Sequence, residues 1–464
     1  MIHRYVKNGL HFVLDVNSGA VHVLDELCYA VSGLIDADMA EACPQAIVDA
    51  LPQYPAEEVR EAYGELYELK RAGLLFAEDD YIDVSRYIPV GAPVKALCLH
   101  VAHDCNLRCK YCFASTGDFG QGRKIMPPEI AKKAIDFVIA RSGKRHNIEV
   151  DFFGGEPLMA WDTVVQTVDY ARSLEEKHGK KFRFTITTNG LLLDADKQAY
   201  ITENMDNVVL SLDGRPSVND EFRKTVSGAG SYDVIVPKFK ALVDARDPEK
   251  DYYARGTFTS HNLDFAEDVV HIADAGFNRL SVEPVTADPG CGYDLTEADL
   301  PQIEAEYDRL TEIMLERRKA GKPFSFFHFM VDLDQGPCVV KRLRGCGAGY
   351  EYVAVTPDGD IYHCHQFVGK EEFKQGSVLD QSFDMDIAAR FAGMNIYSRP
   401  KCQKCWAKFY CSGGCSAANY NMNHDMNDSY DLGCEMERKR LECAIYLKAM
   451  DKMCNNCPAR AAMT

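Results

Sequence analysis

The chain has 464 residues, of which 46% are hydrophobic and 26% charged, a balance typical of a soluble protein with several domains. Asp and Glu number 70 against 52 Lys and Arg, a net charge of −18, which argues against broad binding to nucleic acid phosphates. The N-terminus lacks the layout of a secretion signal, and no apolar stretch approaches the roughly 18 residues that span a bilayer. We therefore expect a cytoplasmic protein with no nucleic acid or membrane partner. The chain has 18 cysteines, and in a reducing compartment we expect the clustered ones to hold metal rather than form disulfides.

Residues 1–90 are predicted to form a separate module. Two apolar runs at 10–16 and 20–24 are joined by Asn17, Ser18 and Gly19, which is a hairpin signal. Helical periodicity follows at 25–35, 44–51 and 56–73. A hairpin with three short helices is typical of a winged helix, so a DNA-binding module is an alternative. Its recognition region is not basic, which disfavours DNA.

From residue 93 to about 320, predicted strands alternate with amphipathic helices. Strands are expected at 94–101, 149–153, 182–187, 208–212, 252–258 and 279–283. The stretch 127–141 places Ile130, Ala134, Phe137 and Val138 on one helical face. Six such repeats predict a parallel barrel or partial barrel with its site at the carboxyl ends of the strands. Beyond Phe324 the sequence is irregular and rich in Gly and Cys, and we expect metal rather than a conventional core to cross-link it.

Three cysteines, Cys105, Cys109 and Cys112, directly follow the first predicted barrel strand at C-x3-C-x2-C spacing. Three thiolates on one loop bind three irons of a four-iron cluster and leave the fourth iron open. A zinc knuckle or a redox dithiol is the alternative. The segment 154–157, Gly-Gly-Glu-Pro, closes the second strand. Backbone carbonyls and a carboxylate there suit an ammonium ligand, and glycines let it approach closely.

This arrangement resembles the radical S-adenosylmethionine (SAM) superfamily, in which the open iron chelates the amino and carboxylate groups of SAM. The resemblance implies that Cys105, Cys109 and Cys112 hold the catalytic cluster. It implies that Gly154, Gly155 and Glu156 receive the SAM amino group. Further SAM contacts are implied for Tyr111, Asn189, Ser211, Asp213, Arg223 and Arg255. For the arginines a surface ion pair, and for Tyr111 core packing, stay open as alternatives.

A second cysteine series lies near the C-terminus. Twelve residues separate Cys346 from Gly359, four separate that glycine from Cys364, and the pattern C-x2-C-x5-C-x3-C follows from Cys402. The series resembles the seven-cysteine SPASM extension, which holds two auxiliary four-iron clusters. The resemblance assigns the first to Cys346, Cys364 and Cys415, and the second to Cys402, Cys405, Cys411 and Cys434. With the catalytic cluster this makes three 4Fe–4S clusters and SAM as cofactors; zinc is the structural alternative for these cysteines.

Other cysteines receive plainer interpretations. Cys338 is either the fourth ligand of the first auxiliary cluster or uninvolved, in which case one iron is open to a substrate thiolate. The pair Cys454 and Cys457 has no assigned role. Five cysteines in or beside apolar segments are expected to be small buried hydrophobes: Cys28, Cys43, Cys98, Cys291 and Cys443.

The runs 13–26, 345–367 and 404–415 resemble the maturases of six-cysteines-in-forty-five (SCIFF) peptides, thioether-forming enzymes of the sactipeptide and ranthipeptide type. The resemblance implies an α/β fold with three parts. These are a winged-helix-like leader-peptide recognition domain at 1–90, a partial (β/α)6 radical SAM barrel at 91–322, and an iron–sulfur SPASM domain at 323–464. The implied partners are a Cys-rich precursor peptide, whose leader adds a strand to the N-terminal module, and a reductant such as flavodoxin or ferredoxin.

The implied reaction joins a Cys sulfur of the precursor to a Thr or other acceptor carbon, through a 5′-deoxyadenosyl radical. The rival on the same scaffold is a SPASM dehydrogenase such as an anaerobic sulfatase maturase, which makes formylglycine. In those enzymes an Asp commonly follows the Cys of the Gly-x4-Cys segment, whereas His365 stands there in this chain. We therefore favour thioether formation. A metal-stabilised DNA-binding protein is the third hypothesis, and it predicts no SAM cleavage.

Overall fold

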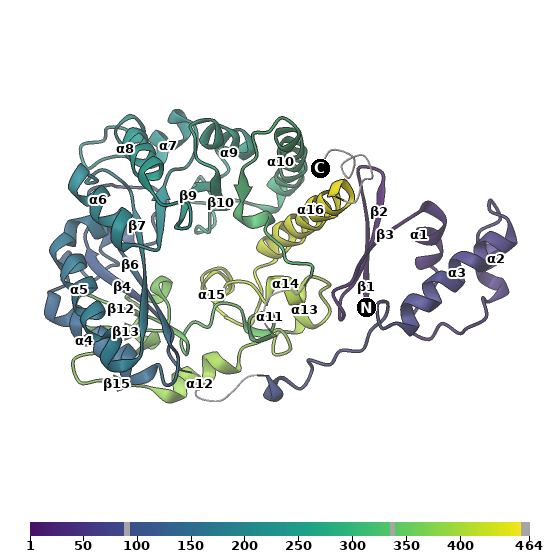
Figure 1. Cartoon of the computed structure of the whole chain (residues 1–464), viewed down its shortest axis with the longest axis horizontal. Helices are drawn as coiled ribbons and strands as arrows, with labels where there is room; N and C mark the ends of the chain where they lie inside the picture. The colour runs from purple at the N-terminus through teal and green to yellow at the C-terminus, as the bar shows by residue number, and fades with distance from the viewer. Residues whose placement is uncertain (88–92, 335–338, 456–464) are drawn as a thin grey trace.

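The computed structural model describes residues 1–87, 93–334 and 339–455. These residues form a three-stranded sheet and a twelve-stranded sheet. Figure 1 shows the small sheet with α1, α2 and α3 at one end of the molecule, the large sheet at the other, and α13, α14, α15 and α16 between them. Cys338 and Cys457 lie outside the described residues, as does the side chain of Cys454. In the described ranges, each helix is too short or too polar to span a lipid bilayer.

The N-terminal module is an antiparallel sheet followed by three helices. Its strands are β1 (Ile2–Lys7), β2 (Leu10–Asp15) and β3 (Val21–Leu24), and its helices are α1 (Glu26–Ser32), α2 (Gln45–Ala50) and α3 (Ala56–Arg71). Buried Asp15 fixes the hairpin turn, because its Oδ1 accepts hydrogen bonds from both N and Oγ of Ser18, each 2.9 Å long. The hairpin and the three helices agree with the prediction. Strand β1 was missed because its polar residues hide the alternation, and a winged helix is not established by this arrangement.

The module packs on α10 (Leu300–Lys319) and α16 (Asp431–Asn455). Its apolar contact with α16 is made by Tyr5, Phe12, Leu14, Ile445 and Tyr446. Beside this cluster the ring of His3 stacks on Trp406, with centroids 3.8 Å apart. Asp308 of α10 pairs with Lys7 of β1 and with Lys439 of α16. The small sheet is therefore joined to the rest of the chain by both apolar and charged contacts.

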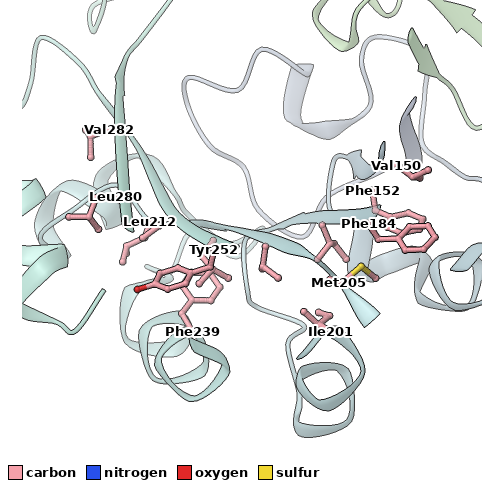
Figure 2. Packing of buried hydrophobic residues seen from close by; sticks show 14 of the residues in the cluster. Val150, Phe152, Phe184, Ile201, Met205, Leu212, Phe239, Tyr252, Leu280 and Val282 are labelled. Carbon is pink, nitrogen blue, oxygen red and sulfur yellow. The ribbon is translucent and has the colours of Figure 1, made fainter. Parts of the chain in front are cut away.

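Six parallel strands form the centre of the large sheet, as predicted. In sheet order they are β4 (Ala96–His103), β6 (Asn147–Gly154), β7 (Lys181–Thr188), β8 (Asn207–Ser211), β9 (Asp251–Phe258) and β10 (Arg279–Pro284). The helices that alternate with them are α4 (Pro128–Arg141), α5 (Trp161–His178), α6 (Ala195–Asn204), α7 (Pro216–Phe222), α8 (Tyr232–Ala245) and α9 (Phe265–Asp274). Figure 2 shows Phe239 of α8 beside Tyr252 of β9, and Ile201 of α6 near Met205, on the helix side of the strands, and all four residues are buried. This core holds the strand ends in place.

Strands from beyond residue 323 extend the same sheet. Strand β12 (Tyr352–Val355) pairs in parallel with β4, and β13 (Asp360–Tyr362), β14 (Lys374–Ser377) and β15 (Ser382–Phe383) continue antiparallel from it. Short β5 (Lys124–Ile125) pairs with β4, and β11 (Ser325–Phe326) ends the other side. The sheet is thus mixed, and it crosses the expected division at 322/323. That division stays a prediction.

The C-terminal region contains a conventional core, contrary to our expectation. Buried aromatic residues gather there, among them Tyr350, Tyr362, Phe367, Phe373 and Phe391. Their spacing follows no helical or strand period because separate short segments supply them: Tyr362 ends β13, Phe367 and Phe373 end single 3-10 turns, and Phe391 lies in α12 (Met385–Gly393). The other helices of this region before α16 are α11 (Val339–Arg344), α13 (Pro400–Gln403), α14 (Lys408–Cys411) and α15 (Ser416–Asn423). Metal is therefore not the sole cross-link of this region.

The five cysteines expected to be buried divide in the structure. Cys28, Cys98 and Cys443 are buried, whereas Cys43 is half-buried and Cys291 is exposed. The prediction for Cys291 was wrong because this residue lies in a turn between Gly290 and Gly292, both with positive φ.

Candidate active site

The triplet Cys105, Cys109 and Cys112 lies on the loop that follows β4. The three side chains are half-buried. Burial raises the pKa of the Cys105 thiol to about 12, with additional contributions from Glu156, Cys109 and Cys112. Burial likewise raises the pKa of Cys109 to about 11, and nearby Cys112 adds to the shift. The nearby Arg223 guanidinium opposes the shift at Cys109, and a bound metal centre would supply further positive charge to the deprotonated thiols.

Asn189, at the end of β7, connects the triplet to the end of β6. Its Nδ2 donates to Cys105 Sγ at 3.6 Å, and its backbone N donates to Glu156 Oε2 at 2.8 Å. The other carboxylate oxygen of Glu156 accepts from Thr188 Oγ1 at 2.8 Å. Leu107 N also donates to Cys105 Sγ, at 3.4 Å. Cys105 is thus oriented by donors from its own loop and from a neighbouring strand.

The Glu156 carboxylate, which is expected to receive the SAM amino group, is held by hydrogen bonds from the protein. Glu156 is 1% exposed and accepts hydrogen bonds from Leu158 N, Thr188 and Asn189. Burial raises its pKa to about 7, although those hydrogen bonds act in the opposite direction. Glu156 thus supports Asn189, and its direct contact with SAM stays a prediction.

Glycine at 154 and 155 is required by the backbone of the cysteine loop. A Cβ on Gly155 would lie 2.2 Å from the carbonyl oxygen of Asp104, and one on Gly154 would lie 2.2 Å from that of Ala102. Gly154 also has φ +124°, a conformation that disfavours side chains. We had attributed these glycines to the approach of a ligand. In the structure they let the ends of β4 and β6 pack together.

Asp213 forms a buried network with two other predicted SAM contacts. Its carboxylate is fully buried and accepts from Tyr111 Oη at 2.5 Å and from Thr257 N at 3.0 Å, and it pairs with Arg223 Nε at 3.0 Å. The Arg223 guanidinium lies 5.6 Å from the Tyr111 ring centre. Asp213 therefore orients Tyr111 and Arg223. Direct contacts of these three residues with SAM stay predictions.

Ser211 and Arg255 are adjacent in the sheet, where they are paired in the register of β8 and β9. The Arg255 guanidinium donates to Glu283 of β10, with Nε to Oε1 at 2.9 Å and a second contact to Oε2. Burial alone would raise the pKa of Glu283, but Arg255 outweighs it and holds that pKa at about 2. Arg255 therefore occupies an ion pair, the alternative considered for it, and Glu283 is a site residue that the sequence analysis missed. The rule that sites lie at strand ends would have found it.

The seven C-terminal cysteines lie in two groups. In the first auxiliary group, burial raises the pKa of Cys364, and Cys415 and Cys346 add to the shift. In the second auxiliary group, burial raises the pKa of Cys411, with contributions from Cys434, Cys402 and Cys405. Across the described chain, His, Cys, Asp and Glu form no group of three or more suited to a single metal ion. Sets of three and four sulfur donors fit iron–sulfur clusters, and this ligation stays a prediction.

A cavity of about 370 Å³ lies between the end of β10 and both auxiliary groups. Its lining includes Glu283, His328, Gln366, Cys415, Cys434 and Arg440. Cys346 and Cys415 of the first group are exposed. His365, the residue after Cys364, accepts from or donates to Tyr352 Oη at 2.8 Å, and burial lowers its pKa to about 4, which keeps it neutral. The cavity thus lies between Glu283 at the end of β10 and Cys415, the exposed cysteine of its lining.

Residues 99–253 match the model of the radical SAM superfamily, and residues 346–406 match that of SPASM, an iron–sulfur cluster-binding domain. The chain combines a radical SAM domain with an SPASM domain. Both matches include the cysteines described above: the first contains the whole triplet, and the second contains Cys346, Cys364, Cys402 and Cys405.

Three curated relatives share a quarter or so of their sequence with this chain. The radical SAM cyclopropyl synthase TigE of Paramaledivibacter caminithermalis is 24% identical over 71% of this chain and 70% of its own. The mycofactocin maturase MftC of Mycobacterium ulcerans is 28% identical over 71% and 84%. A cysteine-type anaerobic sulfatase-maturating enzyme of Clostridium novyi is 24% identical over 72% and 90%.

Two solved structures show the same fold. The structure of anSMEcpe with bound AdoMet and Kp18Cys peptide has a TM-score of 0.63 at 19% identity, covering 79% of this chain and 100% of that one. Streptococcus suis SuiB bound to precursor peptide SuiA has a TM-score of 0.53 at 16% identity, covering 92% and 98%. The second match extends over nearly all of this chain.

Proposed function

We propose that this protein is a radical SAM/SPASM enzyme that forms intrapeptide thioether links in a ribosomally synthesised, Cys-rich precursor peptide. The observation that carries the proposal is the cavity that lies between Glu283 at the carboxyl end of β10 and Cys415, an exposed cysteine of the first auxiliary group. An acceptor carbon beside the barrel and a peptide thiol beside Cys415 fit this arrangement. The likeness to a mycofactocin maturase and to an enzyme bound to its precursor peptide supports a peptide substrate.

The triplet would hold a 4Fe–4S cluster with SAM, and the two auxiliary groups one further cluster each. When bound, these groups supply a 5′-deoxyadenosyl radical and an acceptor for the electron that the closing bond releases. Asn189 and Leu107 orient Cys105 through N–H donors to its sulfur. Tyr111 and Arg223 are held by Asp213 as an aromatic surface beside a fixed cation. The reductant, such as flavodoxin or ferredoxin, belongs to the same proposal.

Whether the first auxiliary group keeps one iron open depends on Cys338. The three described members of the group leave room for a fourth ligand, either a peptide thiolate or Cys338, which lies outside the described residues. The exposure of Cys346 and Cys415 favours a peptide thiolate, since an exposed edge admits a substrate.

The test of the catalytic assignment replaces Cys105, Cys109 and Cys112 together by Ala. We expect the purified variant to retain about eight irons, by the four-iron arithmetic of two remaining clusters, and to form no 5′-deoxyadenosine. The matched control replaces buried Cys443, which lies in no group, and should leave both measurements unchanged. Continued formation of 5′-deoxyadenosine by the triple variant would refute the assignment.

The second candidate is a SPASM dehydrogenase that makes formylglycine, favoured by the sulfatase-maturating relative and by the anSMEcpe fold match. The two reactions differ in atoms lost from the peptide. A thioether link removes two hydrogen atoms and keeps the sulfur, whereas conversion of Cys to formylglycine removes the sulfur. Mass spectrometry of a Cys-rich precursor after co-expression with this enzyme separates the two.

A further inference from the structure

Arg399 lies where the two auxiliary groups meet. It precedes α13 and is 3% exposed. Its Nη1 donates to the carbonyl oxygen of Gly413, and its Nη2 donates to Ser416 Oγ at 2.9 Å. Both partners belong to the turn 411–416, which runs from Cys411 of the second group to Cys415 of the first. The guanidinium therefore fixes residues 412–414, which are the shortest stretch of chain between the two groups.

The backbone of this turn is built around the guanidinium. Ser412, Gly413 and Gly414 have φ values of 60°, 89° and 72° in succession, and such values are costly for a residue with a side chain, as Ser412 is. A Cβ on Gly413 would lie 2.2 Å from Arg399 Nη1. The glycine thus makes space for Arg399, and Arg399 in turn satisfies the carbonyl that this unusual conformation presents.

The positive charge of Arg399 acts on both groups. Burial lowers its pKa, and the charges that oppose this effect come from Cys402, Cys411, Cys415 and Cys346. Its Nε is buried without a hydrogen-bond partner. A buried cation requires nearby negative charge, and here the cysteines of both groups provide it.

Two other cations near the second group differ from Arg399. Lys408 is buried, but it pairs with Asp79 at 2.7 Å. Arg438 lies 4.0 Å from Cys405 Sγ and also pairs with Glu435. Both have a carboxylate that offsets their charge, whereas the hydrogen bonds that Arg399 donates within the described residues go to neutral oxygens.

We propose that Arg399 is a positioning residue whose charge, which no carboxylate offsets within the described residues, stabilises the reduced state of both auxiliary clusters. The inference rests on the proposed function, because it takes the two groups as cluster ligands. Adding an electron to a cluster adds negative charge, and a fixed cation at low dielectric favours that state. Since one charge serves two clusters, its removal affects both reduction potentials in the same direction.

The experiment compares Arg399→Met, Arg399→Lys and Arg438→Met in the reconstituted enzyme. Iron content and redox titrations monitored by electron paramagnetic resonance are measured for each. We expect Arg399→Met to keep its iron and to shift the reduction equilibrium of both auxiliary clusters at least tenfold toward the oxidised state, about 59 mV for one electron. Arg399→Lys keeps the charge and should stay within tenfold of the parent. Arg438→Met should affect the second group alone, and the catalytic cluster should be unchanged in all three.

Unchanged auxiliary potentials in an iron-replete Arg399→Met variant would overturn the inference, as would a shift of one cluster only. If that variant loses iron, Arg399→Lys decides: potentials within tenfold of the parent support a charge effect, and a larger shift of both contradicts it. Failure of the cluster assignment, on which the inference rests, gives a different result, because the unmodified protein itself would then hold fewer than the roughly twelve irons expected of three four-iron clusters. Failure of thioether formation alone would appear in the mass of the peptide and would leave the expected potentials unchanged.

Discussion

Asn189 contacts a predicted cluster ligand and a buried carboxylate at once, so it offers a direct test of the candidate active site. Asn189→Ala removes the donor to Cys105 Sγ. Loss of such a supporting partner typically costs about 10–100-fold in metal affinity or activity. We expect a decrease of this size in the rate of 5′-deoxyadenosine formation, with iron content retained. The control is Asn204→Ala, which removes an amide that donates to Tyr200 O on a helix distant in sequence from the triplet. An equal decrease in the control would contradict the assignment.

Asp151 of β6 predicts a pH dependence. Burial, with help from Glu149, raises the pKa of Asp151 from 3.8 to about 6. The folded protein therefore holds this proton more tightly than the unfolded chain does, so its contribution to stability is present below pH 3.8 and is lost as pH rises to about 6. Asp151→Asn stays neutral and should be more stable than the parent above pH 6, by up to about 3 kcal/mol. Urea unfolding across this range should show the difference vanish in acid. A difference independent of pH would contradict the prediction.

The sequence predicted the cysteines of the candidate site, but it did not predict the burial or the ion pairs of the residues around them. Spacing alone identified the triplet, whereas the division of the seven later cysteines into two groups came from the resemblance to SPASM proteins. Spacing could not show that Glu156 and Asp213 point inward, since burial depends on packing between strands. It also could not show that Arg255 pairs with Glu283, which lies 28 residues away.

At the scale of elements, the ends of β9 and β10 meet at the Arg255 and Glu283 pair. Removing Arg255 deprives the Glu283 carboxylate of its ion-pair partner beside the cavity, and a partly exposed carboxylate left without its cation is less well held. We expect Arg255→Met to lower the rate at which modified peptide forms by at least about tenfold, which corresponds to about 1.4 kcal/mol. The rate of SAM cleavage without peptide should persist. If Arg255 instead bound SAM, cleavage without peptide would fall as well. Arg279→Met, which disrupts the pair with Asp251 at the opposite end of these strands, is the control.

Strand β4 is buried along all eight residues and lies between β6 and β12. A fragment of residues 93–322 lacks β12 and leaves one edge of β4 unpaired. Because long apolar edges associate with one another, we expect this fragment to aggregate, and a fragment of residues 93–384, which contains β12 to β15, to be more soluble. Light scattering of the two compares them. A monomeric 93–322 fragment would show that the barrel is independent of β12.

The prediction of strands succeeded where the apolar pattern was local and failed where pairing was distant. The six central strands are long enough for their periodicity to be read from the sequence. Strand β12 has four residues, and its partner β4 lies about 250 positions earlier. No short window of the sequence contains that relationship.

At the scale of the whole molecule, the N-terminal module offers two edge strands, and we propose that the leader peptide adds to β3. Val23 of β3 and Val6 of β1 are both exposed valines on edge strands. Proline removes a backbone donor and prevents strand pairing. We expect Val23→Pro to weaken precursor binding, measured by fluorescence anisotropy, and Val6→Pro to spare it. Deletion of residues 1–90 is a poorer test, because it uncovers Ile445 and Tyr446 of α16. Equal losses in both proline variants would argue against β3.

The packing of the small sheet on α16 has a consequence for biosynthesis. The N-terminal strands emerge from the ribosome first, yet the helix that covers Phe12 and Leu14 is the last one in the described chain. The same helix carries Cys434 of the second auxiliary group. Domains usually fold in the order of their synthesis, but here the first segment must wait for the last. Iron delivered to the second group before α16 is synthesised would therefore meet an incomplete set of ligands, so its loading is a step that follows the synthesis of α16.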